Sequence, residues 1–246
     1  MNTVITKAMV FAAGLGTRLK PFTDIHPKAL FKVNGSTLLE RNIAYLKRYG
    51  INDIVINVHH FAEQIIDYVA LHNSWGIKIT FSDESDFLLD TGGGLFKARP
   101  LLEDAENMVL YNADILTDLP LDKMMDFHLL HQPMATLSVS DRKSSRYFLF
   151  DSENRLSGWE NIVSGEQKIK IHNIPLQQKA FSGIHIIHRS LFNTRDAIEK
   201  LSITDWYLEL CKDQTILGYN DSTSTFIDVG KPASLGEAEK LLNSQD

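Results

Sequence analysis

The stretch that most constrains this chain is an apolar run ending in a short glycine loop, followed by positive charges. Residues 10–19 read VFAAGLGTRL, and Lys28 follows. Glycine lets backbone N–H groups turn toward a bound group, and successive inward-pointing N–H groups form a concavity that suits phosphate. Arg18 adds a planar fork and Lys28 a compact point charge, which makes them the candidate catalytic cations. The predicted polyphosphate-binding backbone comprises Ala12, Ala13, Gly14, Leu15, Gly16 and Thr17.

The spacing excludes two common phosphate-binding motifs. A dinucleotide fingerprint requires a third glycine where this chain has Leu19. A P-loop requires G-x-x-x-x-G-K-[ST], and the loop does not fit that pattern. The alternative to a phosphate site is an ordinary strand-to-helix turn with surface charges.

The N-terminal part alternates between strand and helix patterns. Apolar, β-branched runs predict strands over residues 3–13, 54–58 and 77–81. A capping box from Thr37 to Glu40 predicts a helix that ends at Gly50, and Phe61, Ile65 and Val69 form a second helical stripe. This β-α-β-α-β order predicts an α/β fold: a Rossmann-like, mixed but mainly parallel sheet flanked by helices.

Three further places in the sequence carry candidate ligand-binding groups. Residues 89–94 (LDTGGG) are expected to form a glycine-rich loop before a helix, in which Asp90, Gly92 and Gly93 approach a flat ligand such as a nucleobase; the alternative is a flexible loop. His59 follows the second strand at the same ligand-binding edge. Asp114 follows a strand over residues 108–111, where open α/β sheets bind ligands, and is a candidate Mg²⁺ ligand.

The segments around these groups are expected to be regular. Asp118 is expected to cap a helix over residues 121–130. Residues 144–179 are interpreted as antiparallel strands and a loop over the cleft. Helices are expected over 195–201 and 204–211, and a last one is striped by Leu235, Ala238 and Leu241.

Composition restricts the class of partner and compartment. A net charge of −6 and a pI near 5.8 argue against a nucleic-acid surface. Cys211 is the single cysteine, which rules out an internal disulfide and fits a reducing compartment. No apolar run reaches the length of a transmembrane helix, and the run before Arg18 is shorter than a typical signal-peptide core. We therefore expect a cytoplasmic protein that binds neither nucleic acid nor membrane.

Four segments together resemble the sugar-phosphate nucleotidyltransferases, which join a nucleoside triphosphate to a sugar 1-phosphate and release pyrophosphate. The segments are residues 12–28, 89–98, 112–118 and 226–238, of which the first is highly specific. This resemblance implies the nucleotide-diphospho-sugar transferase fold in a single domain over residues 1–246. One departure is Ala113 before Asp114, where the family usually has glycine.

Within the family, residues 91–98, 181–183 and 226–230 look most like the N-acetylmuramic acid 1-phosphate uridylyltransferases of cell-wall recycling. The resemblance implies a second metal ligand, Asp228, so that Asp114 and Asp228 hold Mg²⁺. It also implies that the sugar lies against Asn112, Ser182 and Gly183. Many relatives hold the sugar phosphate with a further lysine, for which Lys143, Lys168 and Lys170 are the options.

Several functions remain open at this point. One is a uridylyltransferase that uses UTP and N-acetylmuramic acid 1-phosphate, acting as a monomer or small homo-oligomer. Others are a glucose- or mannose-1-phosphate nucleotidyltransferase, or a cytidylyltransferase of an alcohol phosphate. A different class is a non-catalytic domain that binds nucleotide sugars and regulates a partner. The joint presence of Arg18, Lys28, Asp114 and Asp228 favours an enzyme.

Overall fold

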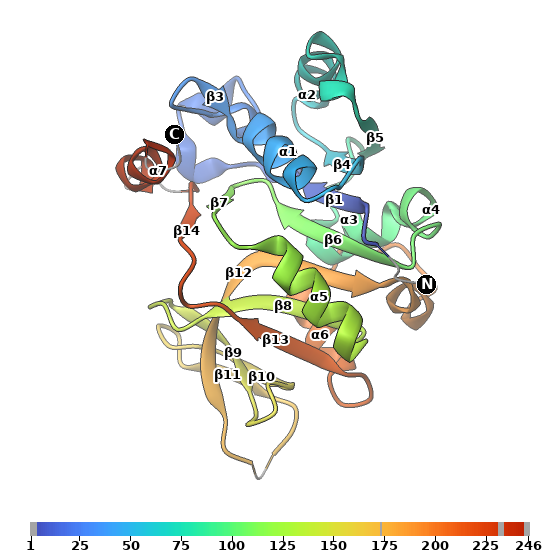
Figure 1. Cartoon of the computed structure of the whole chain (residues 1–246), viewed down its shortest axis with the longest axis vertical. Helices are drawn as coiled ribbons and strands as arrows, with labels where there is room; N and C mark the ends of the chain where they lie inside the picture. Colours follow the sequence, from blue (N-terminus) through green and yellow to red (C-terminus); the bar gives the residue numbers. More distant parts are fainter. Residues whose placement is uncertain (1–3, 173, 231–233, 244–246) are drawn as a thin grey trace.

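The predicted alternation folds into the parallel part of a ten-stranded sheet. The computed structural model describes residues 4–172, 174–230 and 234–243. The parallel strands lie in the order β6-β1-β4-β5 (Figure 1). Their bounds are Lys7–Phe11 (β1), Asp53–Val58 (β4), Lys78–Asp83 (β5) and Asn107–Asn112 (β6). The carboxyl ends of all four strands therefore meet at one edge.

The second part of the sheet is largely antiparallel. The long strand β12 (Gln177–His188) pairs antiparallel with β6, β8 and β9. The remaining strands of the sheet are β8 (Ala135–Ser140), β9 (Arg146–Phe150), β10 (Leu156–Asn161), β11 (Glu166–Ile169) and β13 (Ile216–Asn220). The predicted mixed α/β sheet is confirmed, as are the antiparallel strands within 144–179.

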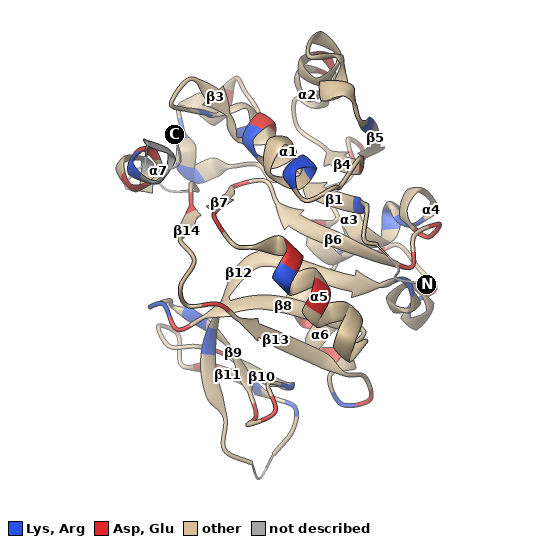
Figure 2. Ribbon diagram, in the orientation of Figure 1, with Lys and Arg blue, Asp and Glu red and all other residues tan. Residues whose placement is uncertain are grey.

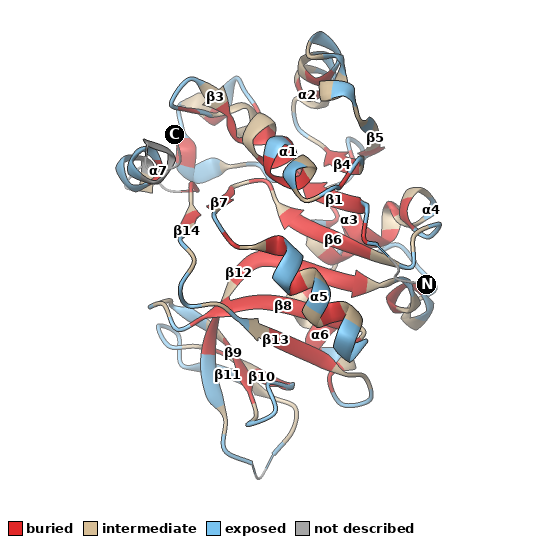
Figure 3. Cartoon of the chain, viewed as in Figure 1, coloured by how far each residue is buried: buried red, intermediate tan, exposed pale blue. Residues whose placement is uncertain are grey.

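Helices cover both faces of the sheet (Figure 1). One face carries α1 (Leu38–Arg48), α2 (Ala62–Leu71) and α5 (Leu121–His131), and the other carries α3 (Asp90–Lys97), α4 (Arg99–Leu102) and α6 (Ile203–Leu210). Strand β1 supplies both cores, because Ala8 and Val10 point to the first face while Met9 and Phe11 point to the second. The central strands are consequently buried on both sides (Figure 3).

The ends of α1 follow the predicted chemistry. The Thr37 hydroxyl accepts a hydrogen bond of 3.1 Å from the Glu40 amide, as a capping box requires. Gly50 has φ +81° just beyond the helix, where residues with a Cβ are strained. Short 3-10 helices occur at Thr17–Leu19, Phe22–Asp24, Lys28–Leu30, Asn73–Gly76 and Arg189–Thr194.

Three local predictions are wrong. The glycines expected in a loop lie inside α3. Residues 195–201 form no helix, because this segment is hydrogen-bonded to α3 and to the residue before it. The Leu201 amide donates to the Leu89 carbonyl, and the Leu201 carbonyl accepts from the amides of Gly92 and Gly93. Helix α5 begins after Pro120, and Asp118 does not cap it. The Asp118 carboxylate instead accepts a hydrogen bond of 2.6 Å from the Thr225 amide.

A small third core brings the C-terminal segment to the carboxyl edge. Strand β14 (Phe226–Asp228) pairs antiparallel with β7 (Ile115–Thr117), which places Asp228 opposite Ile115 and beside Asp114. Helix α7 (Leu235–Asn243) and the hairpin of β2 (Lys32–Val33) and β3 (Ser36–Thr37) complete this part. Pro232, which we expect to open the last helix together with Gly230, lies outside the described residues.

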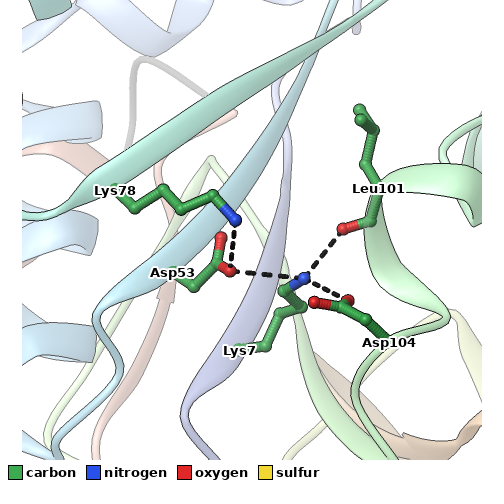
Figure 4. Close-up of polar contacts among 5 residues, drawn as sticks. All are labelled: Lys7, Asp53, Lys78, Leu101 and Asp104. Atoms are coloured by element: carbon green, nitrogen blue, oxygen red, sulfur yellow. Dashed lines mark hydrogen bonds and ion pairs between the residues drawn. The ribbon is translucent and has the colours of Figure 1, made fainter.

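A buried lysine lies at the opposite edge of the sheet, where the amino ends of the parallel strands meet. Lys7 is 4% exposed; its Nζ donates to the Leu101 carbonyl at 2.9 Å and lies 3.3 Å from a carboxylate oxygen of Asp53 (Figure 4). It also pairs with Asp104, and Lys78 pairs with Asp53 from the solvent side. This cluster ties β1, β4 and α4 together away from the carboxyl edge. No helix in the described part of the chain is long and apolar enough to span a bilayer.

Candidate active site

The glycine loop after β1 presents open backbone amides at the carboxyl edge. A Cβ on Gly14 would have nothing within 4 Å, so the loop is uncovered there. Gly16 has φ +61°, and a Cβ there would lie 2.9 Å from both the Lys28 Cβ and the Thr23 Cγ2. The amides of Gly14, Leu15 and Gly16 have no hydrogen-bond partner among the described residues. They are therefore available to an anion, as the predicted concavity requires.

The two preceding amides are used differently. The amides of Ala12 and Ala13 donate to Oδ1 of Asn57 at 2.7 and 3.3 Å, so they are not part of the open concavity. Asn57 Nδ2 in turn donates to Glu84 Oε1 at 2.7 Å, and the other Glu84 oxygen accepts from the Leu89 amide. Burial raises the pKa of the Glu84 carboxyl. Sequence reasoning missed both Asn57 and Glu84, although a polar residue ending a β-branched strand is a usable signal.

Two pairs of opposite charge flank the loop. Lys28 Nζ forms an ion pair with Asp114, and Arg18 Nη1 lies 3.8 Å from Asp228 Oδ2. Gly230 lies between the pairs: a Cβ there would be 2.5 Å from Asp228 Oδ1, 2.7 Å from Arg18 Nη2 and 2.9 Å from Lys28 Nζ. The four predicted charged residues are therefore adjacent in space, although they are far apart in sequence.

Three adjoining hollows form one cleft along this edge. The central hollow, about 430 Å³, is lined by the glycine loop with Arg18, Lys28, Asn112 and Asp114. The inner hollow, about 310 Å³, shares Phe11, Gly14, Leu88 and Thr91 with it. The outer hollow, about 830 Å³, shares Arg18, Asn112 and Asp114 with it. A long ligand can therefore lie along the cleft past the charged pairs.

The inner hollow contains part of the predicted base-binding set. Asp90 lines it together with Asn57, Glu84 and Lys200. Its lining lacks three residues of that set, His59, Gly92 and Gly93. The His59 ring nitrogen bonds the Glu84 carbonyl at 2.7 Å, behind the hollow.

The backbone at the triple glycine closely approaches another segment of the same chain. A Cβ on Gly93 would lie 2.1 Å from the Glu199 carbonyl oxygen, and one on Gly92 would lie 2.9 Å from that of Leu201. Close packing of a helix against residues 199–203 therefore accounts for both glycines.

The outer hollow contains part of the predicted sugar-binding set. Asn112 and Gly183 meet there: Gly183 has φ +72°, and a Cβ on it would lie 2.9 Å from Asn112 Nδ2. Ser182 is buried and is not part of the lining.

Basic side chains occupy the far end of the outer hollow. Lys143 lines it, together with Arg142 and Arg146, which sequence reasoning missed. The other two lysine options are absent from the lining, and Lys168 is paired with Asp205. The sequence signal was the basic segment DRKSSR at 141–146, which directly follows β8.

Asp114 and Asp228 form a donor set that suits a hard divalent cation. Both carboxylates line the outer hollow, and no group of three or more His, Cys, Asp or Glu side chains with metal-ligand placement occurs among the described residues. Mg²⁺ is commonly held by one or two carboxylates together with substrate phosphates. The residues present fit such an ion.

Comparison with known proteins agrees with this geometry. The family model described as "Nucleotidyl transferase" matches residues 7–245. An N-acetylmuramate alpha-1-phosphate uridylyltransferase of Neisseria meningitidis is 29% identical over 237 residues, which cover 96% of this chain and 97% of that protein. A mannose-1-phosphate guanylyltransferase catalytic subunit beta of Dictyostelium discoideum is 33% identical over 135 residues, or 54% of this chain and 37% of that protein.

The fold also matches solved structures. The structure of a UDP-glucose pyrophosphorylase complexed with UDP-glucose superimposes with a TM-score of 0.74 at 17% identity, covering 98% of this chain and all of that chain. At this identity the likeness concerns the fold, and it confirms the predicted nucleotide-diphospho-sugar transferase architecture.

Proposed function

The chain belongs to the nucleotidyl transferase family, and we propose that it transfers the uridylyl group of UTP to N-acetylmuramic acid 1-phosphate, releasing pyrophosphate. The observation that carries the catalytic part of this proposal is the arrangement around Gly230. There the pairs Lys28–Asp114 and Arg18–Asp228 adjoin the open amides of the glycine loop.

The reaction requires two polyanions to meet in line. The attacking group is a phosphate monoester oxygen of the sugar 1-phosphate, which displaces pyrophosphate at the α-phosphorus of the triphosphate. Because the second pKa of such a phosphate is about 6, the nucleophile is largely dianionic at neutral pH and needs no general base. The task of the site is positioning and stabilisation of developing charge.

Each residue has a role that follows from its place. The amides of Gly14, Leu15 and Gly16 donate to the triphosphate. Arg18, which is half-exposed at the mouth of the cleft, binds the leaving β- and γ-phosphates. Lys28, which is partly buried beside Asp114, stabilises negative charge at the α-phosphate.

Asp114 and Asp228 are the residues that would hold Mg²⁺. When bound, the ion offsets the repulsion between the two phosphate groups. The carboxylates also orient the cations, since each acid contacts one of them in the structure.

The choice of UTP and a muramic acid sugar is supported by similarity along nearly the whole of both chains to the uridylyltransferase of Neisseria meningitidis. A mannose-1-phosphate guanylyltransferase is the second candidate, because the relative from Dictyostelium discoideum is similar over 54% of this chain. That similarity covers 37% of the relative's own length.

A substrate panel tests the proposal. Pyrophosphate release is measured with Mg²⁺ for UTP, CTP, GTP, ATP and dTTP, each with the 1-phosphates of N-acetylmuramic acid, N-acetylglucosamine, glucose and mannose; CTP is also paired with choline phosphate. We expect selective release with UTP and N-acetylmuramic acid 1-phosphate. Selective release with GTP and mannose 1-phosphate would support the second candidate. Nucleotide binding without release from any pair would favour a regulatory binding domain.

A further inference from the structure

Arg142 is held at the outer hollow in a fixed orientation. One guanidinium nitrogen donates to the Phe181 carbonyl at 2.6 Å, and the guanidinium carbon lies 4.2 Å from the centre of the Phe226 ring. Its Nε is buried and has no hydrogen-bond partner within residues 4–172, 174–230 and 234–243. The side chain is therefore anchored on two sides while part of its donor capacity is unused.

Arg142 also has no carboxylate partner in the part of the chain that the structure describes. Among the described residues no Asp or Glu oxygen lies within 4.0 Å of Arg142, Lys143 or Arg146. The two cations that line the central hollow, Lys28 and Arg18, each have one. Burial lowers the pKa of Arg142, which reflects the cost of desolvating its charge. The charge of Asp228 offsets this cost only in part, and a partly buried cation without an ion pair is stabilised when an anion binds to it.

The position of the three cations shows which anion they can meet. Arg142, Lys143 and Arg146 line the outer hollow and are absent from the lining of the central one. In the proposed function the triphosphate lies in the central hollow, where Lys28 and the open amides are located, and reaches the boundary with the outer hollow, which Asp228 lines. An anion that meets Arg142 without reaching Lys28 therefore belongs to a part of the sugar beyond its 1-phosphate. Figure 2 shows basic residues in the segment between β8 and β9 that carries these side chains.

We propose that Arg142, with Lys143 and Arg146 around it, binds a carboxylate carried by the sugar, and that this contact selects acidic sugar 1-phosphates over neutral ones. A guanidinium can bind a carboxylate through two parallel hydrogen bonds, which makes the contact directional as well as charged. The inference rests on the proposed function, in which the sugar is N-acetylmuramic acid. That sugar differs from N-acetylglucosamine by a lactyl ether that ends in a carboxylate.

A binding comparison tests the inference without requiring turnover. Calorimetry gives the Kd of UDP-N-acetylmuramic acid and of UDP-N-acetylglucosamine for the wild-type chain and for Arg142→Met, which keeps an unbranched apolar side chain over Phe226 but removes the charge. We expect the wild type to prefer the acidic product. Arg142→Met should weaken binding of the acidic product by about 10- to 100-fold, the range of a hydrogen bond to a charged group, and change binding of the neutral product by less than about twofold.

Three further variants complete the test. Arg155→Ala removes an exposed arginine that does not line the outer hollow, and should change neither Kd. Arg142→Lys should restore part of the preference, since it keeps the charge without the fork. If circular dichroism shows that Arg142→Met does not fold, two other variants test the inference: Arg142→Lys and the double variant Lys143→Ala/Arg146→Ala, whose two positions are exposed. Each should weaken binding of the acidic product selectively.

Each other outcome has a distinct meaning. Equal affinity of the wild type for both products would overturn the inference alone. Equal weakening of both products by the Arg142 variants, or by the Lys143/Arg146 pair, would assign these cations to the phosphates and also overturn it. Failure of the wild type to bind either product would contradict the proposed function, and the inference would fall with it.

Discussion

Asn57 donates a hydrogen bond of 2.7 Å from its Nδ2 to Oε1 of Glu84, and both side chains are buried. The same Asn57 accepts from the amides of Ala12 and Ala13 through its Oδ1. Its two functional groups therefore connect the end of β5 to the start of the glycine loop. The position of the amides that we propose to bind phosphate thus depends on a residue that need not touch the ligand.

Replacing Asn57 by alanine should affect both stability and nucleotide binding. Glu84 would lose a partner and two loop amides would lose their acceptor, so we expect the free energy of unfolding to fall by about 1–3 kcal/mol. The KM for the triphosphate should rise more than kcat falls, because the loop amides lose their support. Urea denaturation and steady-state kinetics measure these effects. Asn52→Ala, at an exposed site, is the control, and an unchanged KM in Asn57→Ala would contradict the positioning role.

Replacing Gly230 by alanine should damage the site more than the fold. The added Cβ would meet charged atoms of Asp228, Arg18 and Lys28 within 2.9 Å, so these groups must move apart. We expect kcat to fall by roughly 10- to 100-fold, on the scale of one displaced preorganised donor, with a small change in Tm. Gly236→Ala is the matched control, because a Cβ there has nothing within 4 Å and alanine favours a helix. Similar kinetics in the two variants would show that the charges tolerate displacement.

The parts of the site that lie close together in sequence or end a strand could be predicted. The loop from Gly14 to Gly16 is a local pattern, and Asp114 follows a recognisable strand, so elementary rules locate both. The same rules predict the parallel β-α-β-α-β part of the sheet, because apolar periodicity distinguishes its strands from its helices.

The parts that depend on long-range packing could not be predicted. Asn57 and Glu84 act as a pair only because β4 and β5 are neighbours in the sheet. Gly92 and Gly93 suggest a loop by their conformational freedom, whereas the fold needs them for close contact between a helix and residues 199–203. Arg142 follows a strand end, but only the tertiary structure shows that no described carboxylate pairs with it.

Replacing Asp114 by asparagine should abolish turnover while the fold persists. The variant removes a proposed Mg²⁺ ligand and the partner of Lys28, whose side chain is 12% exposed. We expect kcat to fall by at least about 10³-fold, and the free energy of unfolding to fall by about 1–2 kcal/mol, between the values for exposed and buried ion pairs. Magnesium titrations of activity and urea denaturation check both. Asp122→Asn, at an exposed site on α5, should behave like the wild type. Turnover in Asp114→Asn with unchanged magnesium dependence would exclude the metal role.

Acid should destabilise the protein through two buried histidines. Burial lowers the pKa of His185 to about 3 and that of His128 to about 4. In the unfolded chain both histidines have a pKa near 6.5, so below that pH the unfolded state binds more protons than the folded state. The free energy of unfolding therefore falls as the pH drops from about 6.5 toward the pKa values of the folded state. At pH 5.5 each histidine should lower the free energy of unfolding by about 1.4 kcal/mol. Urea denaturation at pH 7.5 and 5.5 measures the loss.

Two glutamine variants separate this effect from other acid-sensitive groups. His185→Gln should lose less stability between pH 7.5 and 5.5 than the wild type, because glutamine does not titrate. His131→Gln, at an exposed position, should retain the full dependence. The same pH dependence in both variants would show that His185 becomes protonated in the folded state. It would then have to gain compensation from Tyr207, whose hydroxyl bonds its Nδ1 at 2.5 Å.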